Sequence, residues 1–556
     1  MLIGLDVGGT HTDVVLIGKE GLIKKTKVPT DPNNLFESIL EGLEVVTESM
    51  DTHEVKRLVL STTLATNAVV TGSLSSVAMV VAAGPGLDPR LYTCCDAYHC
   101  IRGAVDHRGR EVESLDEEAV ETLAAGFREQ GIDTVGVVGK FSTRNPAHEQ
   151  RMEAILRKAG IKRVFTGHSV SGNLNFPRRI HTTFLNASVS DVHCHFYESV
   201  RESLKCKGID VPIYILKADG GTMGFEDSME RPGEAVMSGP SASVMGAVPW
   251  ANAERDSLVL DVGGTTTDIS VLVKRAPVLE PLGITIGPWR TLIRSLKSIS
   301  VGIGGDSRIW VENGVIHIGP ERRGLPMALG GEEPTPTDAM NLLSDEESRG
   351  DRSLSEKGMT RIGDALGLAP EEAAAKVMET LCCAIVERAR RMVEEINAKP
   401  VYTIHELMDG YRVAPEEILL LGGPAERLAP FLAQYTDARV KIVPKAGVAN
   451  AIGACLARPT REVTLFADTE KGVILVPEEN YSKVMKSHFT LDDAHETARR
   501  FLLDRLGDSD LETEVVESMA FNMVRGFRTT GKNIRVRVQV KPGLVSGYRL
   551  KRGGAA

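Results

Sequence analysis

The 556-residue sequence lacks any run of about twenty apolar residues, and its first residues lead directly into an expected strand. Neither a membrane span nor a secretory signal is expected, which predicts a soluble cytoplasmic protein. A basic excess is missing as well, because 65 Lys and Arg face 75 Asp and Glu, for a net charge of −10. This balance argues against a general nucleic-acid binder. It leaves nucleotide binding open, since that depends on local amides and a metal.

Cysteine is scarce, with eight residues in the whole chain and no paired CxxC spacing. Such usage does not form a disulfide framework, so we expect reduced and partly buried thiols. Cys94, Cys95 and Cys100 are close in sequence, but the fourth ligand that an iron–sulfur cluster needs is not evident.

One eight-residue phrase is present twice. DVGGTHTD at residues 6–13 returns as DVGGTTTD at residues 261–268, with apolar runs on both sides of each copy. Each copy therefore predicts a β-hairpin whose turn is Gly-Gly-Thr. Glycines let successive N–H groups converge on phosphate oxygens, so both turns are predicted to bind the phosphates of ATP. The residues concerned are Gly8, Gly9, Thr10, Gly263, Gly264 and Thr265.

Aspartates frame both phrases and are the catalytic candidates. Asp6 and Asp261 end the first strands, where each is predicted to ligate the Mg²⁺ that accompanies the phosphates, directly or through water. Asp13 and Asp268 either orient metal-bound water or cap the turn. An ordinary hairpin would explain one copy, but turn chemistry alone requires no matching Thr and Asp after the glycines. Two such turns predict two α/β lobes with the nucleotide between them.

Three further segments end expected strands in polar or glycine-rich turns. The polar turn 61–67 follows a buried strand, and Asp219 lies in a turn after the strand 213–217. Strand ends of this kind are where α/β proteins place ligands. The apolar strand 418–421 breaks at Gly422 and Gly423, which lets the backbone lie flat against adenosine.

A metal interpretation of the helical stretch 182–206 is weaker. His195 lies one helical turn beyond Asp191, whereas His193 points elsewhere. No metal site is therefore assigned to these three residues.

Order and content of the motifs resemble the actin, sugar kinase and heat-shock chaperone superfamily of ATPases. Within it the chain resembles the hydantoinase A and 5-oxoprolinase family over about residues 1–457. The hairpin phrases are common to the superfamily, whereas other motifs are narrower. These are TTLATNA at 62–68, DGG at 219–221, SGPSA at 238–242, PTPTDA at 334–339 and GVANAIGA at 447–454.

The resemblance implies an α/β fold with two actin-like ATPase lobes, duplicated phosphate-binding hairpins and a small α+β C-terminal region. It places the first lobe at residues 1–180 and the C-terminal region at 458–556. The second lobe, at 181–457, would carry the second phosphate motif and the adenosine motif at Gly422 and Gly423.

The family implies ATP-driven chemistry on a lactam or cyclic amide carbonyl. The carbonyl oxygen would attack the γ-phosphate to give an imidate phosphate, and water would then open the ring with phosphate as leaving group. ATP and Mg²⁺ are the implied cofactors. The substrate-side candidates are Thr62, Thr63, Thr66, Asn67 and Asp219.

Two alternatives stay open at this stage. One is a subunit of an ATP-dependent acetone or acetophenone-type carboxylase. The other is a nucleotide-driven activator of a corrinoid or other redox protein, although the N-terminus has no ferredoxin-like cysteine set.

Family members often work with a second, hydantoinase B-like subunit, so a homo-oligomer or hetero-oligomer is expected. From Arg525 to Arg552 every charged residue is basic, which marks either a solvated face or a docking place for an acidic partner or anionic ligand.

Overall fold

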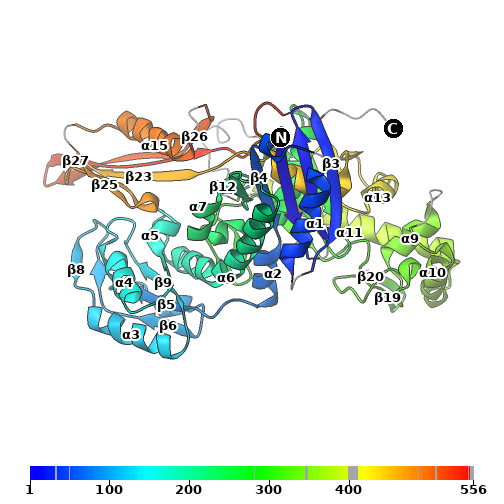
Figure 1. Cartoon of the computed structure of the whole chain (residues 1–556), viewed down its shortest axis with the longest axis horizontal. Coiled ribbons are helices and arrows are strands. Elements are labelled where there is room, and N and C mark those ends of the chain that lie inside the picture. Colours follow the sequence, from blue (N-terminus) through cyan, green and yellow to red (C-terminus); the bar gives the residue numbers. More distant parts are fainter. Residues whose placement is uncertain are drawn as a thin grey trace.

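The structure is a computed structural model that describes residues 1–9, 11–31, 34–48, 50–280, 282–344, 349–398, 411–485, 488–507, 510–548 and 550. In Figure 1 the N-terminal sheet, drawn in blue, lies in the middle of the molecule. The C-terminal sheet, in orange and red, lies above the cyan α/β unit that holds β5, β6 and β9. Thr10 falls outside the described residues.

The first predicted hairpin is confirmed. Asp6 on β1 pairs with Asp13 on the antiparallel β2, and the Gly8 N–H donates to His11 O at 3.0 Å to close the turn. β4 and β11 run parallel to β1 on its other side. The order of the sheet is β12 (Thr222–Gly224), β11 (Ile213–Leu216), β4 (Arg57–Thr62), β1 (Leu2–Val7), β2 (His11–Gly18) and β3 (Gly21–Pro29).

The second sheet repeats this plan. Asp261 pairs with Asp268 in the second hairpin, and the Gly263 N–H donates to Thr266 O at 2.9 Å. The order is β15 (Ala276–Pro277), β14 (Thr267–Val273), β13 (Ser257–Val262), β21 (Glu417–Leu421) and β22 (Arg439–Ile442), with β18 (Ser298–Val301) also on β14. Both sheets are mixed, because each hairpin inserts antiparallel strands beside a parallel core.

Two helices, α8 (Ser238–Ala247) and α14 (Ala449–Leu456), pack between the two sheets. Their shared core joins Val59 of the first sheet to Val259 of the second. The helices touch backbone to backbone, since a Cβ at Gly246 would collide with Ala449 O. Small residues at this crossing thus set the distance between the lobes.

Two smaller units complete the fold. A parallel sheet is covered by α3 (Glu117–Glu129) and α4 (Ala147–Lys158), and its order is β10 (Arg163–Thr166), β9 (Thr134–Gly139), β5 (Ala78–Ala82) and β6 (Ala97–Cys100). The C-terminal antiparallel sheet packs on α15 (Leu491–Leu506), which is the helix predicted at 491–506. Its order is β25 (Tyr481–Val484), β24 (Val473–Val476), β23 (Glu462–Asp468), β27 (Arg528–Val540) and β26 (Thr513–Arg525).

The domain boundaries at 180 and 457 stay predictions. Helix α6 (Phe176–Cys206) runs across residue 180, and β11 and β12 beyond it belong to the sheet of β1. Among the described residues, none of the helices has both the length and the apolar character that crossing a membrane requires.

Candidate nucleotide site

The two hairpin aspartates, Asp6 and Asp261, act on one another. Asp6 is 8% exposed, and burial raises its pKa to about 6, with the charges of Asp13 and Asp261 adding to the rise. Helix α8 contacts both strand ends, because Ser243 donates to Asp261 and Ser238 donates to Thr62 O, which lies opposite Val7 of β1. The structure thus brings together the two strand ends that the duplicated phrase singled out.

The carboxylate of Asp261 is held by the helices between the lobes. Ser243 of α8 donates to its Oδ2 at 2.5 Å, and Asn450 of α14 donates to the same oxygen at 3.3 Å. Burial still raises the pKa of Asp261. In contrast, Oδ1 of Asp6 is buried and has no hydrogen-bond partner within the described part of the chain.

The outer aspartates have different surroundings. Lys27 of β3 forms an ion pair with Asp13 at 2.6 Å, and its charge also reaches Asp261. Asp268 lies opposite Ser300 on β18, and burial followed by the charge of Asp261 raises its pKa to about 7. Sequence reasoning missed Lys27, because no local pattern distinguishes it from the other lysines of its strand.

The glycine turn of the first hairpin has accessible backbone, whereas the turn of the second hairpin is held in place by a neighbouring segment. At Gly9 a Cβ would meet one group, Asn67 Nδ2, at 3.7 Å, so the backbone there is accessible. Gly263 and Gly264 are braced by the segment 302–307, whose Gly305 and Asp306 N–H groups donate to their carbonyls at 2.9 Å and 2.6 Å. Thr265 follows, and its carbonyl accepts from Ser307 Oγ at 3.4 Å.

The PTPTDA motif at 334–339 supports this brace. Thr337, in α9 (Pro336–Leu343), donates from its N–H to Gly305 O at 2.7 Å and from Oγ1 to Asp306 Oδ1 at 3.0 Å. α9 forms within the Gly-, Pro- and charge-rich segment 319–351. The motif therefore fixes a loop against the second hairpin.

Gly422 and Gly423 lie beside the second hairpin, at the end of β21. Gly422 has φ +98°, and a Cβ there would collide with Val262 O and lie 2.8 Å from Asp261 Oδ1. At Gly423 a Cβ would meet nothing within 4 Å. One glycine is thus needed for close approach to the hairpin, whereas the other leaves open backbone, as contact with adenosine requires.

The predicted substrate-side turn lies beside the first hairpin and the start of α8. The N–H of Thr63 donates to Val7 O at 3.2 Å, and Ser238 Oγ donates to Thr62 O at 2.8 Å. Thr66 Oγ1 accepts from the Met237 N–H at 2.8 Å, and Asn67 Nδ2 donates to Thr63 Oγ1 at 3.5 Å. The four residues are therefore grouped next to Gly9, and their substrate role stays a prediction.

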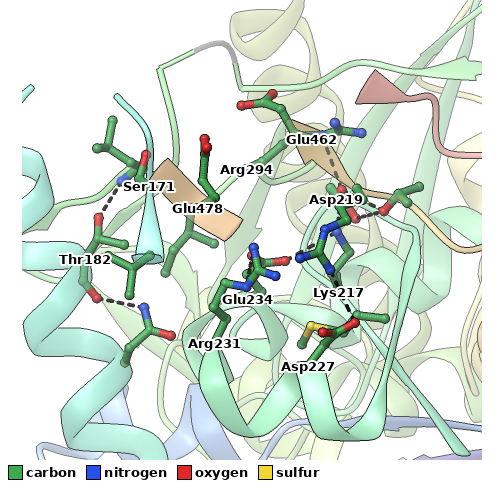
Figure 2. Close-up of a pocket in the computed structure, with 17 residues that line it drawn as sticks. Ser171, Thr182, Lys217, Asp219, Asp227, Arg231, Glu234, Arg294, Glu462 and Glu478 are labelled. Carbon is green, nitrogen blue, oxygen red and sulfur yellow. Dashed lines mark hydrogen bonds and ion pairs between the residues drawn. The ribbon is translucent and has the colours of Figure 1, made fainter. Parts of the chain in front are cut away.

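Asp219 follows β11 as expected but is committed to partners within the protein (Figure 2). Its carboxylate lies 3.2 Å from both Lys217 Nζ and Arg294 Nε, and it accepts from Thr460 Oγ1 at 3.0 Å. Burial would raise its pKa, but the two cations lower it overall. A direct role on substrate stays a prediction that these contacts do not favour.

The residues at the hairpins fit a magnesium ion. A buried carboxylate oxygen without a partner, as at Asp6, is a hard ligand of the kind that Mg²⁺ takes, usually with water and phosphate completing the shell. In the segment 182–206, His193 binds Ser228 Oγ at 2.8 Å and Asp191 pairs with Arg163. Within the described ranges no group of three or more His, Cys, Asp or Glu residues is placed to hold a metal ion.

The fold is that of an actin-like ATPase, with both predicted lobes and the α+β C-terminal region. Two family models match the chain, hydantoinase/oxoprolinase over residues 179–463 and its N-terminal region over residues 2–160. The chain therefore belongs to the hydantoinase/oxoprolinase family, as the sequence motifs indicated.

Relatives align over most of the chain. Caprolactamase subunit alpha of Pseudomonas jessenii is 25% identical over 80% of this chain and 68% of its own. Acetophenone carboxylase gamma subunit of Aromatoleum aromaticum is 26% identical over 90% of this chain and 74% of its own. The crystal structure of the ATP-dependent caprolactamase of P. jessenii superposes with a TM-score of 0.73 and 20% identity, covering 100% of this chain and 89% of that chain.

Proposed function

We propose that this chain is an ATP-dependent hydrolase, or the ATPase subunit of one, that phosphorylates the carbonyl oxygen of a lactam or cyclic amide before the ring opens. The observation that carries the proposal is the pair of matching hairpins whose aspartates, Asp6 and Asp261, are close enough to raise the pKa of Asp6. Family membership and the caprolactamase relative support the same chemistry.

The reaction needs ATP because amide resonance protects the carbonyl from water. The carbonyl oxygen attacks the γ-phosphorus, the bond to the bridging oxygen breaks, and ADP leaves. Water then adds to the imidate carbon, and the carbon–nitrogen bond breaks to free the amine and leave an acyl phosphate. A second water releases phosphate and the carboxylate.

Phosphoryl transfer needs mainly positioning and charge neutralisation. In the proposal the turns at Gly8, Gly9, Gly263 and Gly264 lie around the phosphates. The N–H groups of Gly8 and Gly263 close their hairpins, so those of Gly9 and Gly264 face the phosphates, and Gly423 adjoins adenosine. Asp6 and Asp261 hold the magnesium ion, which neutralises phosphate charge when bound. The turn with Thr62, Thr63, Thr66 and Asn67 faces the carbonyl substrate, since it lies beside Gly9.

We further propose that a second subunit takes part, since relatives that align over most of the chain are named as subunits. The reaction consumes ATP, which places it in the cytoplasm in this proposal.

A carboxylase subunit is the second candidate, because the acetophenone carboxylase gamma subunit aligns over 90% of this chain. In that reaction the same phosphoryl transfer would activate a carbonyl or enol oxygen of a ketone before carbon–carbon bond formation with bicarbonate carbon.

One screen separates the candidates. ATP turnover by the purified chain is measured with lactams, hydantoins and ketones, each with and without bicarbonate. Stimulation by a lactam or hydantoin without bicarbonate supports the hydrolase. Stimulation by a ketone that depends on bicarbonate supports the carboxylase. Turnover that a partner protein triggers without any lactam, hydantoin or ketone contradicts both.

A further inference from the structure

The structure contains a pocket whose lining includes none of the residues of the two hairpins. Its walls come from α6, from the segment between β11 and α8, and from the start of the C-terminal sheet (Figure 2). These parts meet residues 170–171 and 292–294 around one cavity, and more than half of its lining residues are charged.

Most of these charges are already neutralised by one another. Asp219 is surrounded by Lys217, Arg294 and Thr460, as described above. Arg461 pairs with Asp227 at 3.3 Å and with Glu479. These pairs build the walls, and they leave little capacity for a ligand.

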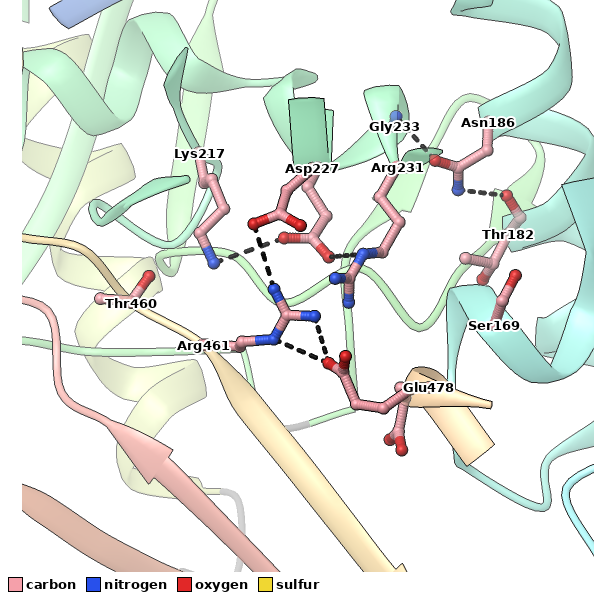
Figure 3. Close-up of polar contacts among 12 residues, drawn as sticks. Ser169, Thr182, Asn186, Lys217, Asp227, Arg231, Gly233, Thr460, Arg461 and Glu478 are labelled. Carbon is pink, nitrogen blue, oxygen red and sulfur yellow. Dashed lines mark hydrogen bonds and ion pairs between the residues drawn. The ribbon is translucent and has the colours of Figure 1, made fainter. Parts of the chain in front are cut away.

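Arg231 is the exception among the cations. Its side chain is 11% exposed, and its ion pair with Glu234 is long, at 3.9 Å from Nε to Oε1. The charge of Glu234 is the largest of four acidic charges that raise the pKa of Arg231, and the others are those of Glu479, Asp227 and Glu478. No hydrogen bond of the terminal nitrogens is found within the described ranges, and Figure 3 shows the guanidinium extending toward the side where Arg461 and Glu478 lie. A nearly buried guanidinium with free donors is suited to bind a carboxylate through two parallel hydrogen bonds.

Glu478 is the exception among the acids. Its Oε1 accepts from the Gly172 N–H at 3.0 Å, but Oε2 has no hydrogen-bond partner and the carboxyl forms no ion pair within the described ranges. Burial raises its pKa to about 7. The charge of Glu478 acts on Arg231 without a direct ion pair between them, so a cationic group in the pocket would supply a partner within hydrogen-bond distance.

Between these two polar groups the wall is partly apolar, through Leu292 and Ile293. A simple anion would satisfy Arg231 but leave the Glu478 carboxyl without a cation, and a simple amine would do the reverse. A short aliphatic molecule with a charge of each sign satisfies both. We propose that this pocket binds a small amino acid, with its carboxylate on the Arg231 guanidinium and its ammonium group facing the Glu478 carboxyl.

The pocket is also connected to the hairpin site. Lys217 follows β11, which pairs with β4, and β4 leads into the substrate-side turn. Ser241 of α8 donates to Ala218 O at 2.6 Å, and Ser243 of the same helix holds Asp261. Ring opening of a lactam yields an amino acid, so, resting on the proposed function, the occupant is the product of the reaction.

Calorimetry on the full chain tests the binding without any assay of turnover. Glycine, β-alanine, 4-aminobutanoate and 6-aminohexanoate are titrated, with butanoate and butylamine as controls that each lack one charge. At least one amino acid should bind, about ten-fold or more tightly than either control. Equal affinity for butanoate, or no binding by any of the four, overturns the proposal.

Variants assign the two contacts. Arg231→Gln and Glu478→Gln should each weaken binding about ten-fold, whereas Arg505→Gln, which alters a more exposed ion pair with Asp227, should leave it unchanged. Arg231→Lys keeps the charge without the planar fork and should also weaken binding, which covers the case in which Arg231→Gln does not fold. Unchanged affinity in both Arg231 variants overturns the assignment.

The outcome is separable from that of the proposed function. Amino-acid binding without lactam-stimulated ATP turnover would contradict the hydrolase proposal and support this binding site. Lactam-stimulated turnover without amino-acid binding would support the hydrolase proposal and contradict this binding site.

Discussion

Asp6 and Asp261 occupy the same position in two hairpins, and the charge of Asp261 helps burial to raise the pKa of Asp6 to about 6. Burial is the largest cause of the rise in the pKa of both carboxyls. In the proposed function a magnesium ion bound by both would favour their ionised forms.

Removing the second carboxylate tests this directly. Asp261→Asn should abolish stimulated ATP turnover, because the amide is a poor ligand for Mg²⁺, while Ser243 and Asn450 keep neutral partners and the fold stays intact. Turnover and the thermal transition are measured together. Glu371→Gln, at an exposed residue in the first turn of α11 (Pro370–Ala398), is the matched control. Normal turnover in the Asn variant would refute the assignment.

Acid should compete with the metal. Since the pKa of Asp6 is about 6, protonation below that pH removes the ligand, so Mg²⁺-dependent nucleotide binding should weaken as the pH falls from 7 to 5. The affinity for ADP is measured with and without Mg²⁺ across this range. Asp6→Asn should remove the metal-dependent increment at every pH; an undiminished increment would exclude Asp6 as ligand.

Asp268 should set a second pH dependence, this time of stability. Its folded pKa, about 7, lies above its ordinary value of 3.8, so the folded state binds this proton more tightly than the unfolded state. Asp268 contributes its full share to the free energy of unfolding below about pH 4, and this contribution is lost as the pH rises through 7.

Asp268→Asn should therefore stabilise the nucleotide-free protein at pH 8 by on the order of 1 kcal/mol, a figure reduced for partial solvent screening. The gain should vanish near pH 4. Urea unfolding at both pH values measures it, and equal differences at the two would show that the carboxyl has an ordinary pKa.

The glycine pair at the end of β21 offers a matched comparison. Gly422→Ala forces a Cβ into Val262 O at a positive φ and should destabilise the protein by about 2 kcal/mol or more. Gly423→Ala meets no neighbour within 4 Å and should keep the stability while weakening nucleotide binding. Equal melting temperatures for the two variants would contradict the close approach at Gly422.

Substitutions at Thr66 distinguish a structural role of its hydroxyl from a role in substrate binding. Its hydroxyl accepts from the Met237 N–H at the start of α8, where Met237 has φ +66°. Thr66→Val should leave this N–H unpaired and cost about 1 kcal/mol of stability, whereas Thr66→Ser keeps the acceptor and the stability. A fall in substrate affinity in Thr66→Val with unchanged stability would instead assign the hydroxyl to the substrate.

Several features followed from local sequence alone. The hairpins at 6–13 and 261–268 form because apolar strands flank a turn whose glycines permit it, and both conditions lie within about fifteen residues. The helix at 491–506 has a capping box at Thr490 and Asp493, and it begins where that signal predicts. The sheet direction was less accessible, because period-two patterns identify strands but not their partners.

What the sequence by itself determined is the existence of two matching glycine hairpins and the family to which the chain belongs. Only the tertiary structure decided which groups surround them. Ser243 and Asn450 reach Asp261 from two different helices, Lys27 reaches Asp13 from the next strand, and Thr460 reaches Asp219 across 241 residues. Such contacts depend on how helices and sheets pack, and the free energy of packing is spread over many residues rather than written in a local pattern.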